Sequence, residues 1–208
     1  MSAPASIRGG IRTERLIGVH NTGYGMWNIL IVPLFLTIVG MVIGYPLMIL
    51  VHQIKKAAAR DAIEAGLRTK FPAFIGRKPE YIDTAVCGFG SNLSDLTGSG
   101  IAYAGGRIFI VEEGVAAEIP WGDIRSWSWN VEGHDVTRVY GAGDIQTNMQ
   151  VAGANHKAKS AAERASGFTV KTASIDKPDW RFQTADVTVL KRWMEIFAQM
   201  KEGRIERR

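Results

Sequence analysis

The sequence predicts a single transmembrane α-helix followed by a mainly-β domain, in which a bent antiparallel sheet is closed by a C-terminal amphipathic helix. Three observations lead to this fold class: an apolar block at 26–51, short apolar runs divided by turn residues from Gly100 onward, and an apolar stripe near the C-terminus. The 208 residues are enough for one such helix and one domain of about 120 residues.

The apolar block at 26–51 has only Asn28 and Thr37 as clearly polar side chains. A bilayer core of ~30 Å needs about 20 helical residues, and a soluble helix of this length shows a polar face. A signal peptide fits less well, because its apolar core is about 7–15 residues long. We therefore expect an uncleaved, single-pass transmembrane helix at 24–53.

The basic residues beside this block suggest its orientation. They are more numerous on its C-terminal side, which favours a C-terminal domain in the cytoplasm and a location in the inner membrane. The lone Cys87 cannot form an internal disulfide, which agrees with a reducing compartment. Lys55, Lys56 and Arg60 are the candidates for contact with anionic lipid headgroups, at ~1 kcal/mol each.

Gly40 and Gly44 are spaced so that two helices can approach closely, which makes them candidates for helix packing and for a homo-oligomer. The alternative is that they are ordinary glycines of a membrane helix, where glycine is frequent.

The rest of the chain divides by composition. Residues 54–71 are rich in alanine with mixed charges, and predict a juxtamembrane helix that ends near Pro72. The expected organisation is a flexible arm at 1–23, the transmembrane helix at 24–53, the juxtamembrane helix at 54–71, a turn-rich segment at 72–99 that leads into the domain, the domain itself at 100–203 with an insertion at 142–167, and a basic tail at 204–208.

Within the domain, short apolar runs separated by turns predict a β-meander. The runs lie at 101–103, 107–112, 115–119 and 124–131, and a hairpin joined through 175–178 follows the polar insertion. The last segment predicts an amphipathic helix, with Thr184 as its cap and Gly203 at its end. The core positions of this helix are Leu190, Trp193, Phe197 and Met200.

Two stretches, "GGRIFIVEEGVAAEIPWGDIRSWSW" and "TVKTASIDKPDWRF", are followed by a helix that carries a tryptophan. This order resembles the pleckstrin-homology-like (PH-like) domains of an uncharacterised bacterial family of membrane-anchored proteins. The resemblance covers roughly residues 98–200 and implies a PH-like fold without a catalytic signature. The insertion at 142–167 departs from the family pattern and leaves the register of the middle strands open.

Arg125, Trp127 and Trp129 are expected on one face of a strand, opposite Ser126 and Ser128. That face is a candidate for binding a partner. The alternative is that the rings pack in the core, as large rings usually do.

No known catalytic, metal or cofactor motif is found in the sequence. The four histidines form no zinc spacing, and "GFGSNLSDLTGSG" lacks the Lys-Ser/Thr of a phosphate loop. Cys87 with His134 is the remaining nucleophilic pair, with a packed thiol as the alternative. The net charge of +5 permits anionic partners, but its basic residues lack the stripe and stacking aromatics of a nucleic-acid site.

The sequence therefore predicts a membrane-anchored, non-enzymatic binding or scaffold module without cofactors, which recognises a protein, peptide or lipid headgroup. Two alternatives stay open. One is a subunit of a bacterial secretion or conjugation complex, and the other is a hydrolase that depends on Cys87.

Overall fold

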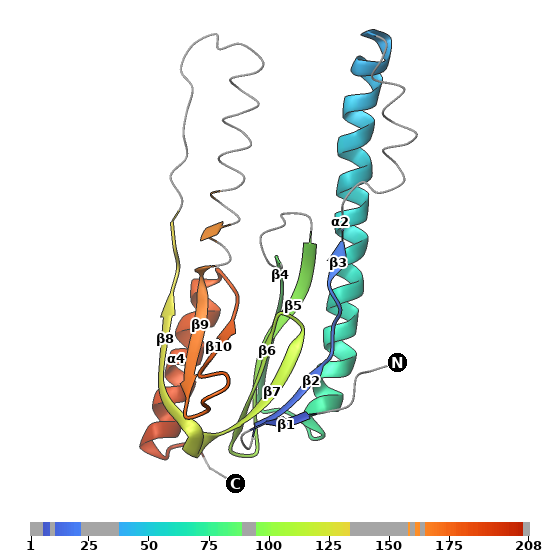
Figure 1. Ribbon diagram of the computed structural model, residues 1–208. Helices are drawn as coiled ribbons and strands as arrows, with labels where there is room; N and C mark the ends of the chain where they lie inside the picture. The colour runs from blue at the N-terminus through green and yellow to red at the C-terminus, as the bar shows by residue number, and fades with distance from the viewer. Residues whose placement is uncertain are drawn as a thin grey trace.

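In the residues that it describes, the computed structural model is mainly β, with the two α-helices α2 and α4 (Figure 1). It describes residues 6–8, 11–21, 38–88, 95–133, 158, 161–162 and 165–205. The elements are β1 (Ser6–Arg8), β2 (Ile11–Arg15), β3 (His20–Asn21), α2 (Ile38–Ile75), β4 (Tyr81–Gly88), β5 (Asp95–Ala104), β6 (Arg107–Glu112), β7 (Val115–Pro120), the 3₁₀ turn η2 (Trp121–Asp123), β8 (Ile124–Asn130), β9 (Gly167–Thr172), β10 (Asp179–Phe182) and α4 (Val187–Glu202).

The strands form two antiparallel sheets. The larger sheet has the order β1-β2-β7-β6-β5-β3, with β4 also paired to β5, and the smaller sheet has the order β10-β9-β8. Two tight turns build the meander β5-β6-β7: Gly105 and Gly106 have φ of 55° and 75°, and Glu113 and Gly114 have φ of 50° and 77°. Two successive residues with positive φ match the right-handed twist of the strands that they join.

The larger sheet is covered on both faces, so β5 is buried along its whole length. On one face, alternate small residues of β5 let α2 lie close to the strand. A Cβ atom at Gly98 would lie 2.9 Å from Leu67 Cδ1, and one at Gly100 would lie 3.0 Å from Phe71 Cε1. The stretch that resembled a phosphate loop thus ends in a strand that α2 packs against.

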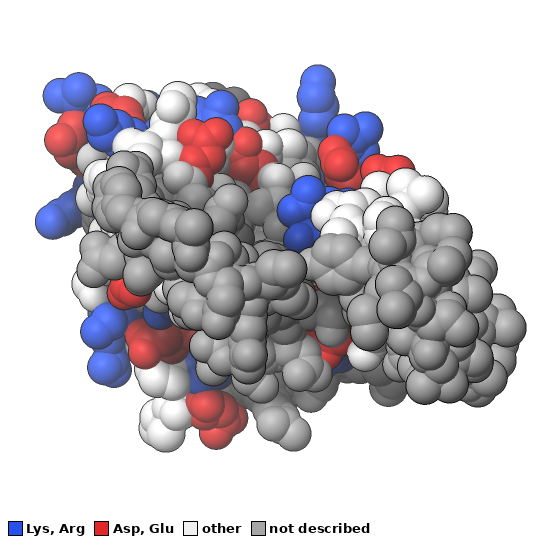
Figure 2. Space-filling view, turned by 90° about the horizontal axis from the view of Figure 1, so that it is seen from above, with Lys and Arg blue, Asp and Glu red and all other residues white. Residues whose placement is uncertain are grey.

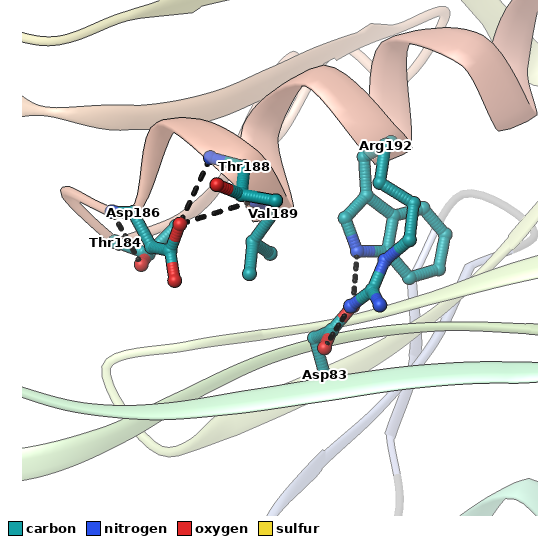
Figure 3. Close-up of polar contacts among 7 residues, drawn as sticks. Asp83, Thr184, Asp186, Thr188, Val189 and Arg192 are labelled. Carbon is teal, nitrogen blue, oxygen red and sulfur yellow. Dashed lines mark hydrogen bonds and ion pairs between the residues drawn. The ribbon is translucent and has the colours of Figure 1, made fainter.

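The other face of the sheet meets the smaller sheet and α4. Leu190, Trp193, Phe197 and Met200 are all buried in this second core, together with Ile196. Asp186 caps α4, because its carboxylate accepts hydrogen bonds from the Thr188 N–H at 2.9 Å and the Val189 N–H at 3.3 Å (Figure 3). The cap is therefore Asp186 rather than the expected Thr184, and Gly203 ends the helix with φ of 74°.

The predicted single transmembrane helix is wrong for the described part of the chain. Among these residues, no helix combines the length and the apolar character that crossing a bilayer requires. Instead, α2 runs unbroken through Pro46 and Pro72, and its C-terminal half carries charged side chains and packs on the sheet. Residues 26–37 of the apolar block lie outside the described residues.

The expected boundaries differ in other ways. The arm at 1–23 contributes β1, β2 and β3, and the segment at 72–99 contains β4 and the start of β5. There is no break between residues 53 and 54, because residues 38–53 of the expected transmembrane helix and the whole expected juxtamembrane helix at 54–71 fall in α2. Most of the insertion at 142–167 and the end of the tail, 206–208, lie outside the described residues. The expected location in the inner membrane stays a prediction.

The N-terminal strand is held by contacts from distant parts of the chain. Arg12 to Arg15 pair with β7, and the Leu16 and Ile17 N–H groups donate to the Gly114 carbonyl at 2.8 and 3.1 Å. The Arg12 guanidinium lies 4.7 Å from the centroid of the Phe74 ring on α2. These long-range contacts make the N-terminal segment part of the domain.

Candidate functional site

The three residues of the candidate partner face lie on β8, the outer strand of the smaller sheet (left in Figure 1). Trp127 and Trp129 are half-buried, whereas Arg125 is exposed. A β-bulge between Ile124 and Ser126 interrupts the pairing with β9 at Arg125. Because of the bulge, Arg125 does not follow the regular alternation of side chains that places Trp127 and Trp129 on one face. The expected three-residue face is therefore reduced to the two tryptophans, with Arg125 beside its beginning.

An aromatic cluster supports the β8 tryptophans. The ring centroids of Trp121 and Trp127 are 5.7 Å apart, and each lies near Phe197 of α4, at 5.6 and 5.4 Å. Phe197 also contacts Phe168 of β9 at 4.9 Å. Aromatic pairs at such distances contribute about 0.5–1.5 kcal/mol beyond their buried area, so this cluster fixes β8 against α4.

The β8 strand offers an open edge. Within the described residues, β8 pairs with β9 alone. Proteins usually protect such edges with lysine, proline or a bulge. The strand, with sequence IRSWSWN, has neither lysine nor proline, and its bulge lies at the beginning. From Ser126 to Asn130 the pairing with β9 is regular, so this stretch presents a regular row of backbone groups.

A polar contact joins β4 to α4. Asp83 accepts a hydrogen bond from Trp193 Nε1 at 2.7 Å and forms an ion pair with Arg192 (Figure 3). Because the Trp193 side chain is fully buried, its N–H needs a partner within the protein. Neither Asp83 nor this contact was found from the sequence, since the two residues are far apart along the chain and no local pattern links them.

The lipid-headgroup and helix-packing candidates lie on a different element. Lys55 and Lys56 are half-buried and Arg60 is exposed, all on α2. Gly40 and Gly44 also fall in α2. In Figure 1, α2 lies on the opposite side of the molecule from β8. The structure thus keeps these candidates apart from the β8 tryptophans.

Cys87 lies on β4 with its Sγ 3.7 Å from the Thr97 carbonyl oxygen. Burial, together with the nearby carboxylates of Glu113 and Glu112, raises the pKa of Cys87 to about 12. The side chain is therefore a neutral thiol at physiological pH, whereas a cysteine nucleophile needs a thiolate. His134, its proposed partner, lies outside the described residues.

No group of His, Cys, Asp or Glu side chains in the described ranges could hold a metal ion. The β8 strand contributes aromatic surface, the Ser126 and Ser128 hydroxyl groups, backbone and, near its beginning, the Arg125 guanidinium.

Trp121 is a member of the site whose role the sequence did not reveal. It directly follows Pro120 and begins η2, which connects β7 in one sheet to β8 in the other. Its ring is thereby placed beside Trp127 and Phe197. The feature of the sequence that could have indicated this role is a tryptophan directly after Pro120, where the chain turns from one sheet to the other.

Comparison of the chain with protein-family models, curated proteins and solved structures finds no match. The resemblance to PH-like domains therefore stays a prediction.

Proposed function

We propose that this protein is a non-enzymatic binding module that takes up an extended peptide segment of a partner protein along the outer edge of β8. The observation that carries the proposal is the regular, unprotected stretch from Ser126 to Asn130, beside two half-buried tryptophans. An added strand would hydrogen-bond to the backbone of this edge, and its alternate side chains would meet the tryptophan surface.

The packing of β8 against α4 favours peptide binding at the β8 edge. The Trp121–Trp127–Phe197 cluster joins β8 to α4, so the strand is held in place before a ligand arrives. A preorganised site spends less free energy on ordering itself. Aromatic side chains are also enriched where proteins bind one another.

In the described part of the chain, β4 is the other long strand that pairs on one side only, but its sequence YIDTAVCG offers no pair of tryptophans to an added strand. The Cys-dependent hydrolase is disfavoured by the raised pKa of Cys87.

The test uses the purified full chain and a random peptide library. A selected peptide is resynthesised with single N-methyl groups at successive backbone amides. Strand addition predicts that methylation at every second amide abolishes binding, because alternate amides of an added strand point to the edge. Hydrogen exchange at 126–130 should slow when the parent peptide binds.

A matched pair of variants locates the site. Trp129→Ala should weaken peptide binding about tenfold or more, in line with aromatic hot spots, whereas Ile82→Ala, which removes an exposed side chain of β4, should leave binding unchanged. Thermal unfolding of both variants checks that they fold. Uniform tolerance of N-methylation, or exchange protection confined to another strand, would contradict the proposal.

A further inference from the structure

The two halves of α2 have different surroundings. The C-terminal half packs on the sheet through buried side chains such as Ile63 and Phe71. The N-terminal half runs past the ends of the strands (Figure 1). Figure 2 shows uncharged surface on the α2 side of the molecule, beside acidic and basic side chains.

Apolar side chains of the N-terminal half are exposed over a wide side of the helix. Four large ones are 40%, 42%, 55% and 59% exposed, namely Leu47, Ile49, Leu50 and Ile54. Successive residues of an α-helix are turned by about 100°, which places these four within an arc of about 160°. Among the described residues between 46 and 60, every exposed one lies in this arc or within about 20° of it, and every half-buried one lies outside it. The seam of a helix pair is narrower than this, whereas a lipid surface covers a whole side of a helix.

The charges beside this apolar arc have one sign. No aspartate or glutamate occurs between residues 38 and 60, but Lys55, Lys56 and Arg60 do. Lys56 lies about 20° outside one border of the arc, and Arg60 is exposed within it, one turn further along the helix. Long basic side chains at the border of an apolar face can reach anionic headgroups while their methylene groups stay on the apolar surface. The first acidic residue of α2 is Asp61, so the segment next to the arc is purely basic.

We propose that the exposed side of α2 between residues 46 and 58 lies on an anionic phospholipid surface. The apolar arc enters the boundary between headgroups and acyl chains, where an interfacial helix buries its apolar face ~5–10 Å deep. Lys56 and Arg60 then meet the phosphate groups, which favours anionic over neutral lipid. A protein partner would need side chains complementary to half of a helix, whereas lipid covers apolar surface of any outline.

The proposed contact involves one side of a bilayer and no crossing of it. It does not depend on peptide binding at β8, because β8 lies on the other side of the molecule from α2 (Figure 1).

The first experiment measures flotation of the purified full chain with vesicles. Vesicles of phosphatidylcholine alone are compared with vesicles that contain equal parts of phosphatidylcholine and phosphatidylglycerol. We expect binding to the mixed vesicles that weakens as salt is added, because salt screens charges at a surface.

A pair of uncharged substitutions tests the apolar arc. Leu50→Gln with Ile54→Gln should lower the affinity for the mixed vesicles about tenfold or more, because less apolar surface leaves water. The matched control is Ala65→Gln with Thr69→Gln, which changes two exposed residues in the C-terminal half of α2 and should leave the affinity unchanged. Circular dichroism checks that both variants keep their helices.

A second pair tests the charges. Lys56→Gln with Arg60→Gln should lower the affinity about tenfold or more, at ~1 kcal/mol for each basic residue near the surface, and should reduce the salt dependence. Arg77→Gln with Lys78→Gln removes the same charge from exposed residues after the end of α2. This control should have a much smaller effect.

An environment-sensitive label locates the contact. In a Cys87→Ala background, a nitrobenzoxadiazole dye on Ile54→Cys should shift its emission to the blue when the mixed vesicles are added, as it does on entering an apolar medium. The same dye on Thr69→Cys should keep its emission.

Four results would overturn the proposal. They are a wild-type chain that does not bind the mixed vesicles at low salt, equal binding by the Leu50→Gln, Ile54→Gln variant, a label that responds as much at position 69 as at position 54, and a reversible dimer in place of vesicle binding that the same two glutamines abolish. The last result would assign this side of α2 to a second copy of the chain.

Discussion

The carboxylate of Asp83 accepts a hydrogen bond from Trp193 Nε1 at 2.7 Å, and this contact joins the first long strand after α2 to the last helix of the chain. Trp193 is fully buried, so its indole N–H cannot turn to water. Arg192, the preceding residue, meets the same carboxylate from the solvent side. One acidic residue thus positions α4 against the larger sheet while the aromatic cluster holds its other end against β8.

Replacing Asp83 by alanine should lower the free energy of unfolding by about 1–3 kcal/mol, because the buried indole N–H loses its acceptor. Arg192→Ala removes only the half-exposed ion pair and should cost less than about 1 kcal/mol. Urea denaturation followed by tryptophan fluorescence measures both. Equal losses for the two variants would mean that the charge, and not the indole hydrogen bond, is the main contribution.

Gly114→Ala should be strongly destabilising, by more than about 2 kcal/mol, since it combines strain with a clash. Gly114 has φ of 77°, and a Cβ atom there would lie 2.2 Å from the Ile17 carbonyl oxygen. The N-terminal strand should detach first, which limited proteolysis near residue 17 can detect.

Gly122→Ala is the matched control for that substitution, because a Cβ atom at Gly122 meets no atom within 4 Å. Its thermal midpoint should stay close to that of the wild type. If Gly114→Ala were as stable as Gly122→Ala, the turn and the N-terminal strand would have to be more adaptable than the structure implies.

Asp186→Ala should reduce stability by about 1 kcal/mol through loss of the helix cap. Its carboxylate receives two backbone N–H groups of the first turn of α4. Thr184→Ala should have a smaller effect, since the Thr184 hydroxyl accepts only the Asp186 N–H, at 3.2 Å. Thermal melts of the two variants compare them directly, and a larger effect for Thr184 would identify it as the true cap.

Elements with a strong local pattern could be predicted from the sequence. The expected run at 107–112 is β6, and the run at 115–119 is β7 (Val115–Pro120). The C-terminal helix and its buried residues also match their predicted spacing. In these segments the turn glycines and the alternation of apolar residues depend only on near neighbours, so the sequence carries the information locally.

Elements that depend on distant partners could not be predicted in this way. The first half of β5 reads as a loop because of Gly98 and Gly100, yet these glycines are there to admit Leu67 and Phe71. The strand β2 is short, and it forms by pairing with β7, about a hundred residues later. The even apolar character of 26–51 suggested lipid, although α2 continues into a half that packs on protein. For β5, the signal that could have been used was the alternation of small residues at Gly98 and Gly100, which leaves room for a helix on that face of the strand.

Of the candidate site, the sequence predicted the residue types but not their arrangement. Trp127 and Trp129 were expected to share a face with Arg125, and the bulge at Arg125 separates it from them. A bulge depends on the facing strand, so a single strand cannot reveal it. The Asp83–Trp193 contact could not be predicted from the sequence for the same reason, because it depends on how two elements far apart in the chain pack together.

Cys87 should react slowly with iodoacetamide in the native protein, more than about 100-fold below the rate in urea, because only the thiolate attacks. The pKa of Cys87 is raised to about 12 by burial and by the neighbouring carboxylates of Glu113 and Glu112. A native rate close to the denatured rate at pH 8 would show a thiol far more accessible and acidic than its surroundings predict, and would revive the nucleophile hypothesis.

The same raised pKa predicts how stability depends on pH. The folded protein keeps the Cys87 proton up to about pH 12, whereas the unfolded chain releases it near 9.0. The stabilising contribution of this group is therefore complete below pH 9 and is lost as the pH rises toward 12. Lysine and tyrosine side chains titrate in the same range, so the quantity to measure is the difference in unfolding free energy between the wild type and Cys87→Ala. That difference should shift in favour of the variant between pH 8 and about pH 10.5, and a constant difference would show that the folded and unfolded states release the proton together.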